Sequence, residues 1–466
     1  MISSILRRTL ERAGRATRLA FSVDFSDGTS YHNRPGEEAV ARLTFHSARA
    51  ELGVILFGHV GLLEAYFNGT LDVDGDYARA YRIGFESGFA KVSGPLAWLR
   101  NQWHELRFGN RSYAFAKRNA RYHYGLGENF YDQWLDSQHM MYTCAYWSDG
   151  TRTVEQAQEN KIDHVCRKIL LEPGERVVDI GCGFGGFMFR AAQRYGVEVC
   201  GVTTTTEQVR FVENKIQRMH LGNRLSVRET DFREVHDQFD KVVSIGVLEH
   251  AGRDQLRDVV RAHAEFLKPG GLGMFHFIGH VGKRNTEFYI RKHIFPGGWI
   301  PSLSQTINYM EAAGLEILDI ENLRRHYALT LDAWSERFER RWPEIQAINP
   351  EKFDERFYRV WRIYLISCAE MFRSEYSGTH LFQITFSKGN VGEGTYPMSR
   401  RLLYADEQIE SQAWNRSSGT RTRVRQIALG RDAVCGVRSV GCLGYRAIAV
   451  LCFLSSRAHQ EYRRRG

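Results

Sequence analysis

Short apolar runs alternate with amphipathic stretches through the middle of the chain. The apolar runs are VVDIGCG, VEVCGVTT, FDKVVSIGV and LGMFHFIGH, and the stretches between them include EQVRFVENKIQRMH and RDQLRDVVRAHAEFLKPGG. The runs have the length of buried strands and the amphipathic stretches have helical spacing. This alternation predicts an α/β domain with a parallel-rich central sheet over residues 116–394. The Pro-Gly-Gly of LKPGG predicts the end of a helix.

The first 115 residues have a less regular pattern. The segment ARLTFHSARAELGVILFG, residues 41–58, predicts strands, and FNGTLDVDGDYARAYRIGFESG, residues 67–88, predicts a turn-rich sheet segment followed by a helix. No cluster of catalytic residue types occurs here. We therefore expect residues 1–115 to form a smaller α+β accessory domain.

The N-terminal segment MISSILRRTLERAGRATRL has the pattern of a basic amphipathic helix. Ile5, Leu6 and Leu10 fall on one side, with arginines around them. Two interpretations remain open. The segment is a solvated first helix, or its basic face contacts anionic lipid headgroups.

Charge changes the picture of the other end of the chain. The formal net charge is +9, but from Thr395 onward there are 13 Arg, no Lys and 5 acidic residues, a net +8. The preceding 394 residues thus carry only +1, so the basic total does not indicate nucleic-acid binding. The composition of residues 395–466 predicts a poorly ordered, arginine-rich extension, with a membrane-binding tail as the alternative.

Eight cysteines are scattered along the chain, and none forms a CxxC pair. This spacing argues against a zinc site and a disulfide framework, and it indicates a reducing, cytoplasmic environment. No apolar run approaches the roughly 20 residues that a membrane-spanning helix needs.

The most informative motif is VVDIGCGFGGF, residues 177–187. An apolar strand delivers Asp179, and Gly181, Gly183 and Gly185 then turn the chain into a helix, as in sites where backbone approaches a nucleotide-containing cofactor. A nicotinamide enzyme would carry an acidic residue after the following strand, whereas this chain has Thr203 and Gln208. The D-I-G-C-G-x-G-G form resembles the S-adenosylmethionine loop of class I methyltransferases, and this resemblance implies that the later step Asp231-Phe232 would flank the adenine.

Eight blocks, in order over about 250 residues, carry a family resemblance. The chain resembles the cyclopropane-fatty-acyl-phospholipid synthases and the mycolic acid cyclopropane synthases. This resemblance implies a Rossmann-like class I methyltransferase fold and S-adenosylmethionine as methyl donor. The blocks are RYHYGLGENFYDQWLDSQHMMYTCAYW, VVDIGCGFGG, GVTTTTEQ, VVSIGVLEHAG, FHFIGH, HIFPGGWIPS, HYALTLDAW and YLISCAEMFR.

The resemblance also implies roles for individual residues. The donor would lie against Tyr142 and Thr143, where the family has Tyr-Ser, and against Asp179, the glycines, Thr203, Gln208 and the Asp231-Phe232 step. A bicarbonate ion would serve as the base, held by Cys144, Glu249, His276, the backbone near Ile278, and Tyr327. Cys368 matches a family cysteine that has been considered catalytic, although its segment reads as a buried helix. No metal is implied.

The implied reaction is methyl transfer to the double bond of an unsaturated fatty-acyl chain, followed by deprotonation and ring closure. The substrate would be membrane phospholipid. The enzyme would be cytoplasmic, associated peripherally with the inner face of the membrane, and would be a homodimer. Two alternatives remain open. One is a fatty-acyl methyltransferase that gives a methyl-branched product, and the other is an inactive lipid- or cofactor-binding paralogue.

Overall fold

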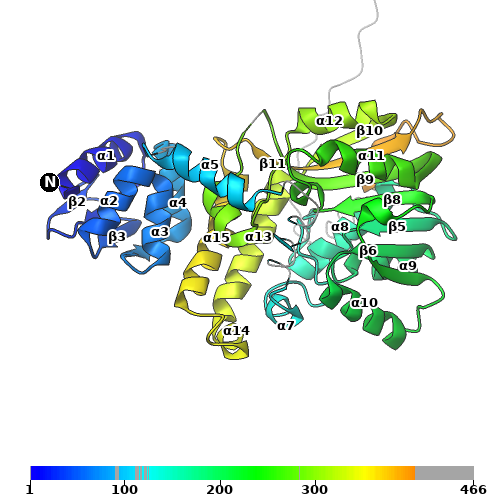
Figure 1. The fold of residues 1–466 in the computed structure, drawn as a ribbon, viewed down its shortest axis with the longest axis horizontal. Coiled ribbons are helices and arrows are strands. Elements are labelled where there is room, and N and C mark those ends of the chain that lie inside the picture. Colours follow the sequence, from blue (N-terminus) through cyan, green and yellow to red (C-terminus); the bar gives the residue numbers. More distant parts are fainter. Residues whose placement is uncertain are drawn as a thin grey trace, which may run out of the picture. The chain divides into compact units, whose positions relative to one another are not determined.

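A seven-stranded sheet forms the centre of the larger part of the molecule. The computed structural model describes residues 2–89, 94–110, 115, 118–119, 123, 125–282 and 284–404. The strand order is β10-β11-β9-β8-β5-β6-β7 (Figure 1), and β5 to β9 are mutually parallel while β11 runs antiparallel to both neighbours. The prediction of a parallel-rich α/β sheet is confirmed. The strands are β5 Arg176–Ile180, β6 Glu198–Thr203, β7 Leu225–Glu229, β8 Phe239–Ile245, β9 Leu267–His280, β10 Leu315–Asn322 and β11 Thr379–Lys388.

Helices bury both faces of this sheet. Neighbouring residues of β5 show this, because Val177 packs in one apolar cluster and Val178 in the cluster on the opposite face. The first cluster includes α8 and α9, and the second includes α11 and α12. The predicted helix stop at LKPGG is confirmed, since α11 ends at Phe266. The helices are α8 Val154–Lys168, α9 Gly186–Tyr195, α10 Thr206–Arg218, α11 Leu256–Phe266 and α12 Leu303–Ala312.

Three further helices precede the last strand. Their apolar faces, and that of the short helix α7 (Glu128–Tyr131), share one cluster with the core of the N-terminal region. Trp134, Trp334 and Trp361 are buried in this cluster. These helices are α13 Arg324–Arg340, α14 Trp342–Ile348 and α15 Glu355–Arg373.

The N-terminal region contains a small four-stranded sheet of order β2-β1-β3-β4. The expectation of strands across residues 41–58 is wrong after Phe45, because residues 48–57 form a helix. The Ser47 side chain accepts a hydrogen bond from the Ala50 amide and caps this helix, whose first turns hold good helix formers. The elements are α1 Ile2–Ala16, β1 Phe21–Asp24, β2 Ser30–His32, β3 Ala41–Phe45, α2 Ala48–Phe57, α3 His59–Phe67, β4 Leu71–Gly75, α4 Tyr77–Glu86 and α5 Ala97–Phe108.

Helix α1 uses its apolar face for packing. Leu6 and Leu10 are buried in the core of the N-terminal region, while Arg8, Arg12 and Arg15 are exposed. The exposed arginines fit both interpretations of this helix, so the choice between them stays open. Its main apolar side chains are already covered by protein.

Ion pairs join the N-terminal region to the α/β region. They are Lys292 with Glu64 at 2.7 Å, His59 with Glu287 at 2.8 Å and Arg82 with Glu370 at 3.1 Å. Among the described residues, no helix has both the length and the apolar character needed to cross a bilayer.

Of the arginine-rich segment 395–466, only residues 395–404 are described. Within them Arg400 pairs with Asp319 of β10, and Tyr404 lies near the His164 ring. The remainder, with three of the cysteines, lies outside the described residues, so the expected poor order of this segment stays a prediction.

Candidate active site

The glycine-rich turn after β5 needs residues without a side chain. Gly181 has φ +74°, and a Cβ on it would lie 2.4 Å from a methyl carbon of Val247. Gly185 has φ +79° and precedes α9, and a Cβ there would lie 2.9 Å from the Phe189 ring. The motif therefore supplies a tight strand-to-helix turn with an open space in front of it.

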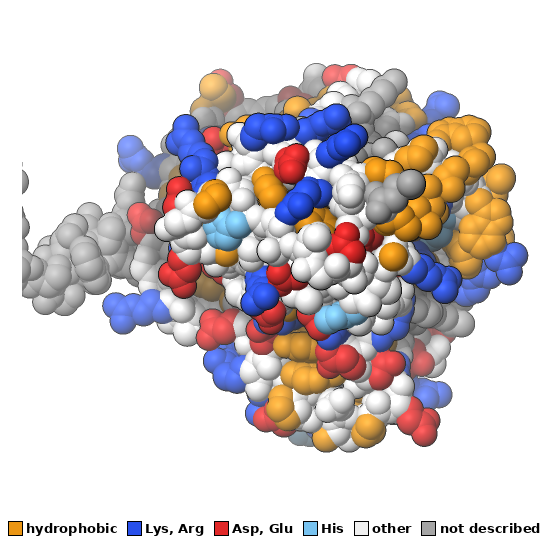
Figure 2. All heavy atoms as spheres, turned by 90° about the vertical axis from the view of Figure 1, so that its left-hand side faces the viewer, with side chains coloured by type: hydrophobic (Ala, Val, Ile, Leu, Met, Phe, Trp, Pro, Cys, Tyr) orange, Lys and Arg blue, Asp and Glu red, His pale blue; other side chains and the backbone are white. Residues whose placement is uncertain are grey.

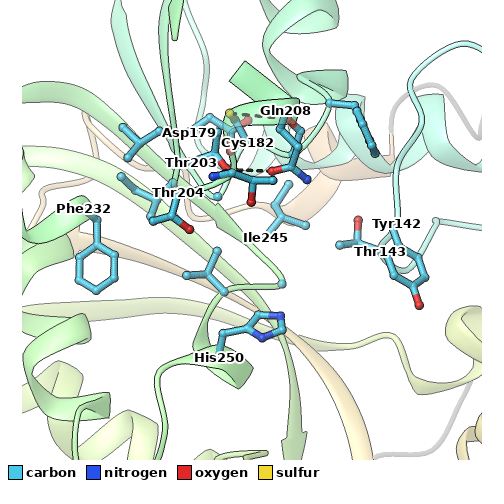
Figure 3. A pocket seen from close by; sticks show the side chains of 18 of the residues that line it. Tyr142, Thr143, Asp179, Cys182, Thr203, Thr204, Gln208, Phe232, Ile245 and His250 are labelled. Carbon is cyan, nitrogen blue, oxygen red and sulfur yellow. Dashed lines mark hydrogen bonds between the residues drawn. The ribbon is translucent and has the colours of Figure 1, made fainter. Parts of the chain in front are cut away.

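A first cavity of about 190 Å³ lies at the carboxyl ends of β5, β6 and β8 (Figure 3). This is the edge where α/β sheets place their ligands. Gly185 does not line this cavity, so its place in the structure is at the helix start. All the other predicted cofactor residues line it: Tyr142, Thr143, Asp179, Gly181, Gly183, Thr203, Gln208, Asp231 and Phe232.

Several polar side chains of this first cavity are fixed by one another. The Thr203 hydroxyl donates to Gln208 Oε1 at 2.8 Å (Figure 3). Asp231 Oδ1 accepts hydrogen bonds from the Arg233 amide at 3.0 Å and from its guanidinium at 2.7 Å. These pairs hold acceptors in place before any ligand arrives.

Lys161 is a buried cation that sequence reasoning missed. Its ammonium donates to the Thr143 hydroxyl at 2.9 Å, and burial lowers the pKa of Lys161 to about 8. Burial also raises the pKa of Asp179 to about 7, and Lys161 opposes this rise. A charged residue within the mostly buried face of α8 was the available signal, but only the fold shows that it meets Thr143.

A second cavity of about 480 Å³ collects all five predicted catalytic residues: Cys144, Glu249, His276, Tyr327 and Cys368. They come from separate elements, namely the segment before α8, a 3-10 turn after β8, strand β9, and helices α13 and α15. Tyr142, Thr143, Gly246 and His250 line this cavity and the first one as well. The two cavities therefore adjoin along these four residues.

Glu249 has one oxygen engaged and one free within the described structure. The Ile278 amide donates to Oε1 at 2.6 Å, whereas the buried Oε2 has no hydrogen-bond partner among the described residues. Burial raises the pKa of Glu249 to about 7. Near neutral pH, a large fraction of this carboxyl group is protonated, and Oε2 then offers a proton to the cavity.

His276 has a similar arrangement. It lies opposite Gln383 of β11, whose amide nitrogen is 3.2 Å from His276 Nδ1. With that nitrogen donating, the imidazole proton lies on Nε2, which is buried without a partner in the described structure. Burial lowers the pKa of His276 well below its usual value, so the ring is neutral. Gln383 carried no sequence signal, since only strand pairing brings it to His276.

The remaining predicted catalytic groups also keep their protons. Burial raises the pKa of Cys144 and Tyr327 well above their usual values, and raises that of Cys368 to about 12. Cys368 is thus a thiol in a buried helix face, which does not favour a nucleophilic role. The Tyr142 hydroxyl lies 2.9 Å from that of Tyr364, another wall residue.

Most of the other walls of the second cavity near these groups are apolar or aromatic, namely Phe295, Leu331, Tyr364, Met371, Phe372 and Leu381. A compact set of neutral polar groups therefore lies beside apolar and aromatic walls, while charged side chains such as Arg100, Glu287 and Arg291 line other parts of the same cavity. Among the described residues, no group of three or more His, Cys, Asp or Glu side chains could hold a metal ion.

Comparison with known proteins agrees with this geometry. Residues 112–384 match the family described as mycolic acid cyclopropane synthetase. A Pseudomonas putida protein named "Probable fatty acid methyltransferase" is 34% identical over 73% of this chain and 85% of its own length. The cyclopropane-fatty-acyl-phospholipid synthase of Escherichia coli K12 is 34% identical over 72% of this chain and 85% of its own.

Solved structures give the same result. The mycolic acid cyclopropane synthase CmaA1, complexed with SAH and CTAB, aligns with a TM-score of 0.54 and 29% identity over 58% of this chain and 98% of its own. SAH is the compound that S-adenosylmethionine becomes once its methyl group has left. The chain therefore belongs to the mycolic acid cyclopropane synthetase family of S-adenosylmethionine-dependent methyltransferases.

Proposed function

We propose that this enzyme transfers the methyl carbon of S-adenosylmethionine to a double bond in a phospholipid acyl chain and closes a cyclopropane ring. The observation that carries the proposal is the junction of the two cavities at Tyr142, Thr143, Gly246 and His250. A donor in the first cavity and an acyl chain in the second would meet there. The phospholipid carrier is supported by the name of the E. coli relative.

The first cavity fits S-adenosylmethionine. Gly181 and Gly183 leave room for close backbone approach, Thr203 and Gln208 present polar atoms, and Phe232 presents a ring. When bound, the donor supplies a methyl group on an electron-poor sulfonium. The side chains of the first cavity would orient that methyl group toward the second cavity.

The second cavity fits a small oxyanion such as bicarbonate, which would supply a proton acceptor. Glu249 Oε2 and His276 Nε2 are buried polar atoms without partners among the described residues, and both hold a proton when the carboxyl group is neutral. Cys144 and Tyr327 add two more protonated groups to the walls of the same cavity. Neutral donors can bind a single negative charge without adding another, and Lys161 places a cation nearby.

The chemistry requires these properties. The π electrons of the alkene form a bond to the methyl carbon, the sulfur–carbon bond breaks, and positive charge remains on the acyl chain. Loss of a proton from the new methyl lets that C–H electron pair close the ring. Apolar walls exclude water from the cation, and aromatic faces such as Phe295 and Tyr364 stabilise it.

A methyl-branched product is the second candidate, and the name of the P. putida relative favours it. The first bond-forming step would be the same. The branched product would retain every hydrogen of the transferred methyl and would require an external hydride donor. The hydrogen-bond donors around Glu249 would hold a bicarbonate that accepts a proton. This arrangement favours proton removal from the new methyl group and therefore ring closure.

The test uses vesicles of unsaturated phosphatidylglycerol and S-adenosylmethionine with a trideuterated methyl group. Ring closure adds one carbon, removes the alkene and leaves two deuterium atoms, whereas a methyl branch keeps all three. Mass spectrometry of the acyl chains distinguishes these products. Label on protein instead of lipid, or an unchanged lipid mass, would contradict the proposal.

A further inference from the structure

Helix α5 exposes large apolar side chains. The exposed fractions are 67% for Trp98, 58% for Leu99, 61% for Trp103 and 66% for Leu106. Leu99, Trp103 and Leu106 share one helix face by their spacing, and only Ala97 and His104 of this helix are buried. Figure 2 shows hydrophobic side chains gathered at the right of the view, with Lys and Arg side chains beside them. Such a patch usually marks an interaction surface.

A wide groove with a positive lining borders this helix. Its lining takes residues from α2, α3 and α5 and includes one acidic side chain, Glu64, which already pairs with Lys292. Within the described part of the chain, no carboxylate pairs with Arg49, Arg107 or Arg118. The basic lining residues are Arg49, Arg100, Arg107, Arg118, Arg291 and Lys292.

This groove adjoins the second cavity of the candidate active site. Val60, Arg100, Phe288 and Arg291 line both spaces. At that boundary the Arg100 guanidinium lies 3.9 Å from the centre of the Phe288 ring. These shared residues place the groove beside α5 next to the cavity that contains Glu249.

We propose that α5 and the basic rim of this groove form the surface that docks on an anionic phospholipid bilayer. The tryptophans and leucines enter the interfacial layer, where amphipathic aromatic rings are favoured, and the arginines contact phosphate groups. An acyl chain then reaches the second cavity through the groove. This last step rests on the proposed function, whereas the docking itself does not.

Two features favour a bilayer over other occupants. The patch combines Trp and Leu with unpaired Arg, which matches an apolar layer bounded by negative headgroups. A second copy of the chain would place the same arginines against one another at a self-complementary interface, which is unfavourable without acidic partners. Helix α1, the other basic amphipathic helix, has already buried Leu6 and Leu10.

The experiment measures vesicle binding of the full chain by co-sedimentation. The variant Trp98→Ser/Trp103→Ser should bind phosphatidylglycerol vesicles about tenfold more weakly than the wild type, because it loses the two largest interfacial side chains. Arg107→Gln should weaken binding about fivefold on phosphatidylglycerol and leave the weak binding to phosphatidylcholine unchanged. The control is Ile5→Ser on α1, which removes an apolar side chain that is 47% exposed and should leave binding unchanged.

Equal vesicle binding by the wild type and the double tryptophan variant would overturn the proposal. A wild-type dimer that becomes monomeric in that variant, with vesicle binding retained, would also overturn it and assign the patch to a second copy. Weaker binding by the variant, together with a wild type that modifies no acyl chain, would support docking while removing the proposed reaction. All variants change exposed residues, so unchanged thermal unfolding confirms that their fold is intact.

Discussion

The two adjoining cavities differ in how their polar groups are satisfied. In the first cavity Thr203 pairs with Gln208, and Asp231 with Arg233, so the acceptors are fixed in advance. In the second cavity Glu249 Oε2 and His276 Nε2 are buried without partners among the described residues. Leaving buried polar atoms unpaired costs stability. The contrast indicates a preorganised binding site beside a site that reserves its donors for a ligand.

They also differ in origin. Most walls of the first cavity come from consecutive strand ends between β5 and α11, joined by Met140 to Thr143. Walls of the second come from both the N-terminal region and helices near the end of the described chain, such as His59 and Met371. A substitution in the first cavity should therefore change the affinity for S-adenosylmethionine. A substitution in the second cavity should change the turnover rate.

The largest effect is expected for Glu249→Gln. Gln can still accept from the Ile278 amide, but its amide N–H replaces the carboxyl O–H that would hold the bicarbonate, and an amide is the weaker hydrogen-bond donor. Methyl transfer to vesicle lipid should fall by at least about 100-fold. Calorimetric affinity for S-adenosylmethionine should stay within about twofold of the wild type. The control is Glu311→Gln on the exposed side of α12, and near-normal turnover in Glu249→Gln would remove Glu249 from the reaction.

Lys161→Met should lower kcat about thirtyfold, because the Thr143 hydroxyl loses a charged donor and the site loses a buried cation. The pKa of Lys161 is about 8, so its charge is lost as the pH rises through 8. Deprotonation of Glu249 near pH 7 should lower kcat in both proteins, and only the wild type should show a further fall through pH 8. Lys352→Met, at an exposed position, is the control, and a kcat equal to the wild type at pH 7 would contradict the assignment.

Gln208→Leu should act on the first cavity alone. It removes the acceptor of the Thr203 hydroxyl, so the dissociation constant for S-adenosylmethionine should rise about tenfold while kcat at saturation stays unchanged. Calorimetry and steady-state kinetics separate the two quantities. Gln217→Leu, on the exposed side of the same helix, is the matched control. A lowered kcat with unchanged affinity for S-adenosylmethionine would contradict the assignment of cofactor binding to the first cavity and turnover to the second.

Stability should depend on pH through Glu249. Its pKa is raised to about 7 in the folded protein from its ordinary value of 4.5, so the folded state holds this proton more tightly than the unfolded state. The contribution of Glu249 to the free energy of unfolding therefore falls as the pH rises from 4.5 through 7. We expect Glu249→Gln to raise the Tm relative to the wild type at pH 8 and to change it less at pH 5. A lower Tm at pH 8 would show that the carboxylate is stabilised by contacts the described residues do not provide.

The smallest effect is expected for Cys368→Ala. The thiol is protonated near neutral pH and lies on a buried helix face, so its removal should change turnover by less than about twofold. A loss approaching that of Glu249→Gln would instead place Cys368 among the catalytic residues of the second cavity.

The sequence by itself determined the sheet and the glycine turn, and family resemblance supplied most of the other predicted residues of the first cavity. Strand-length apolar runs and helical spacing are local signals, and a turn such as Gly181 needs only its own residues to be recognised. The predicted catalytic residues came from family resemblance, and the structure brings them to one cavity.

Tertiary structure alone decided the rest. Gln383 reaches His276 through pairing of β11 with β9, and Lys161 reaches Thr143 through the packing of α8. Residues 48–57 became a helix because its cap and its packing outweighed the strand-like pattern. Helices α1 and α5 both carry apolar and basic residues, yet packing covers Leu6 and leaves Trp103 exposed. Amphipathic pattern shows that a helix has an apolar face, but only its neighbours determine whether protein covers it.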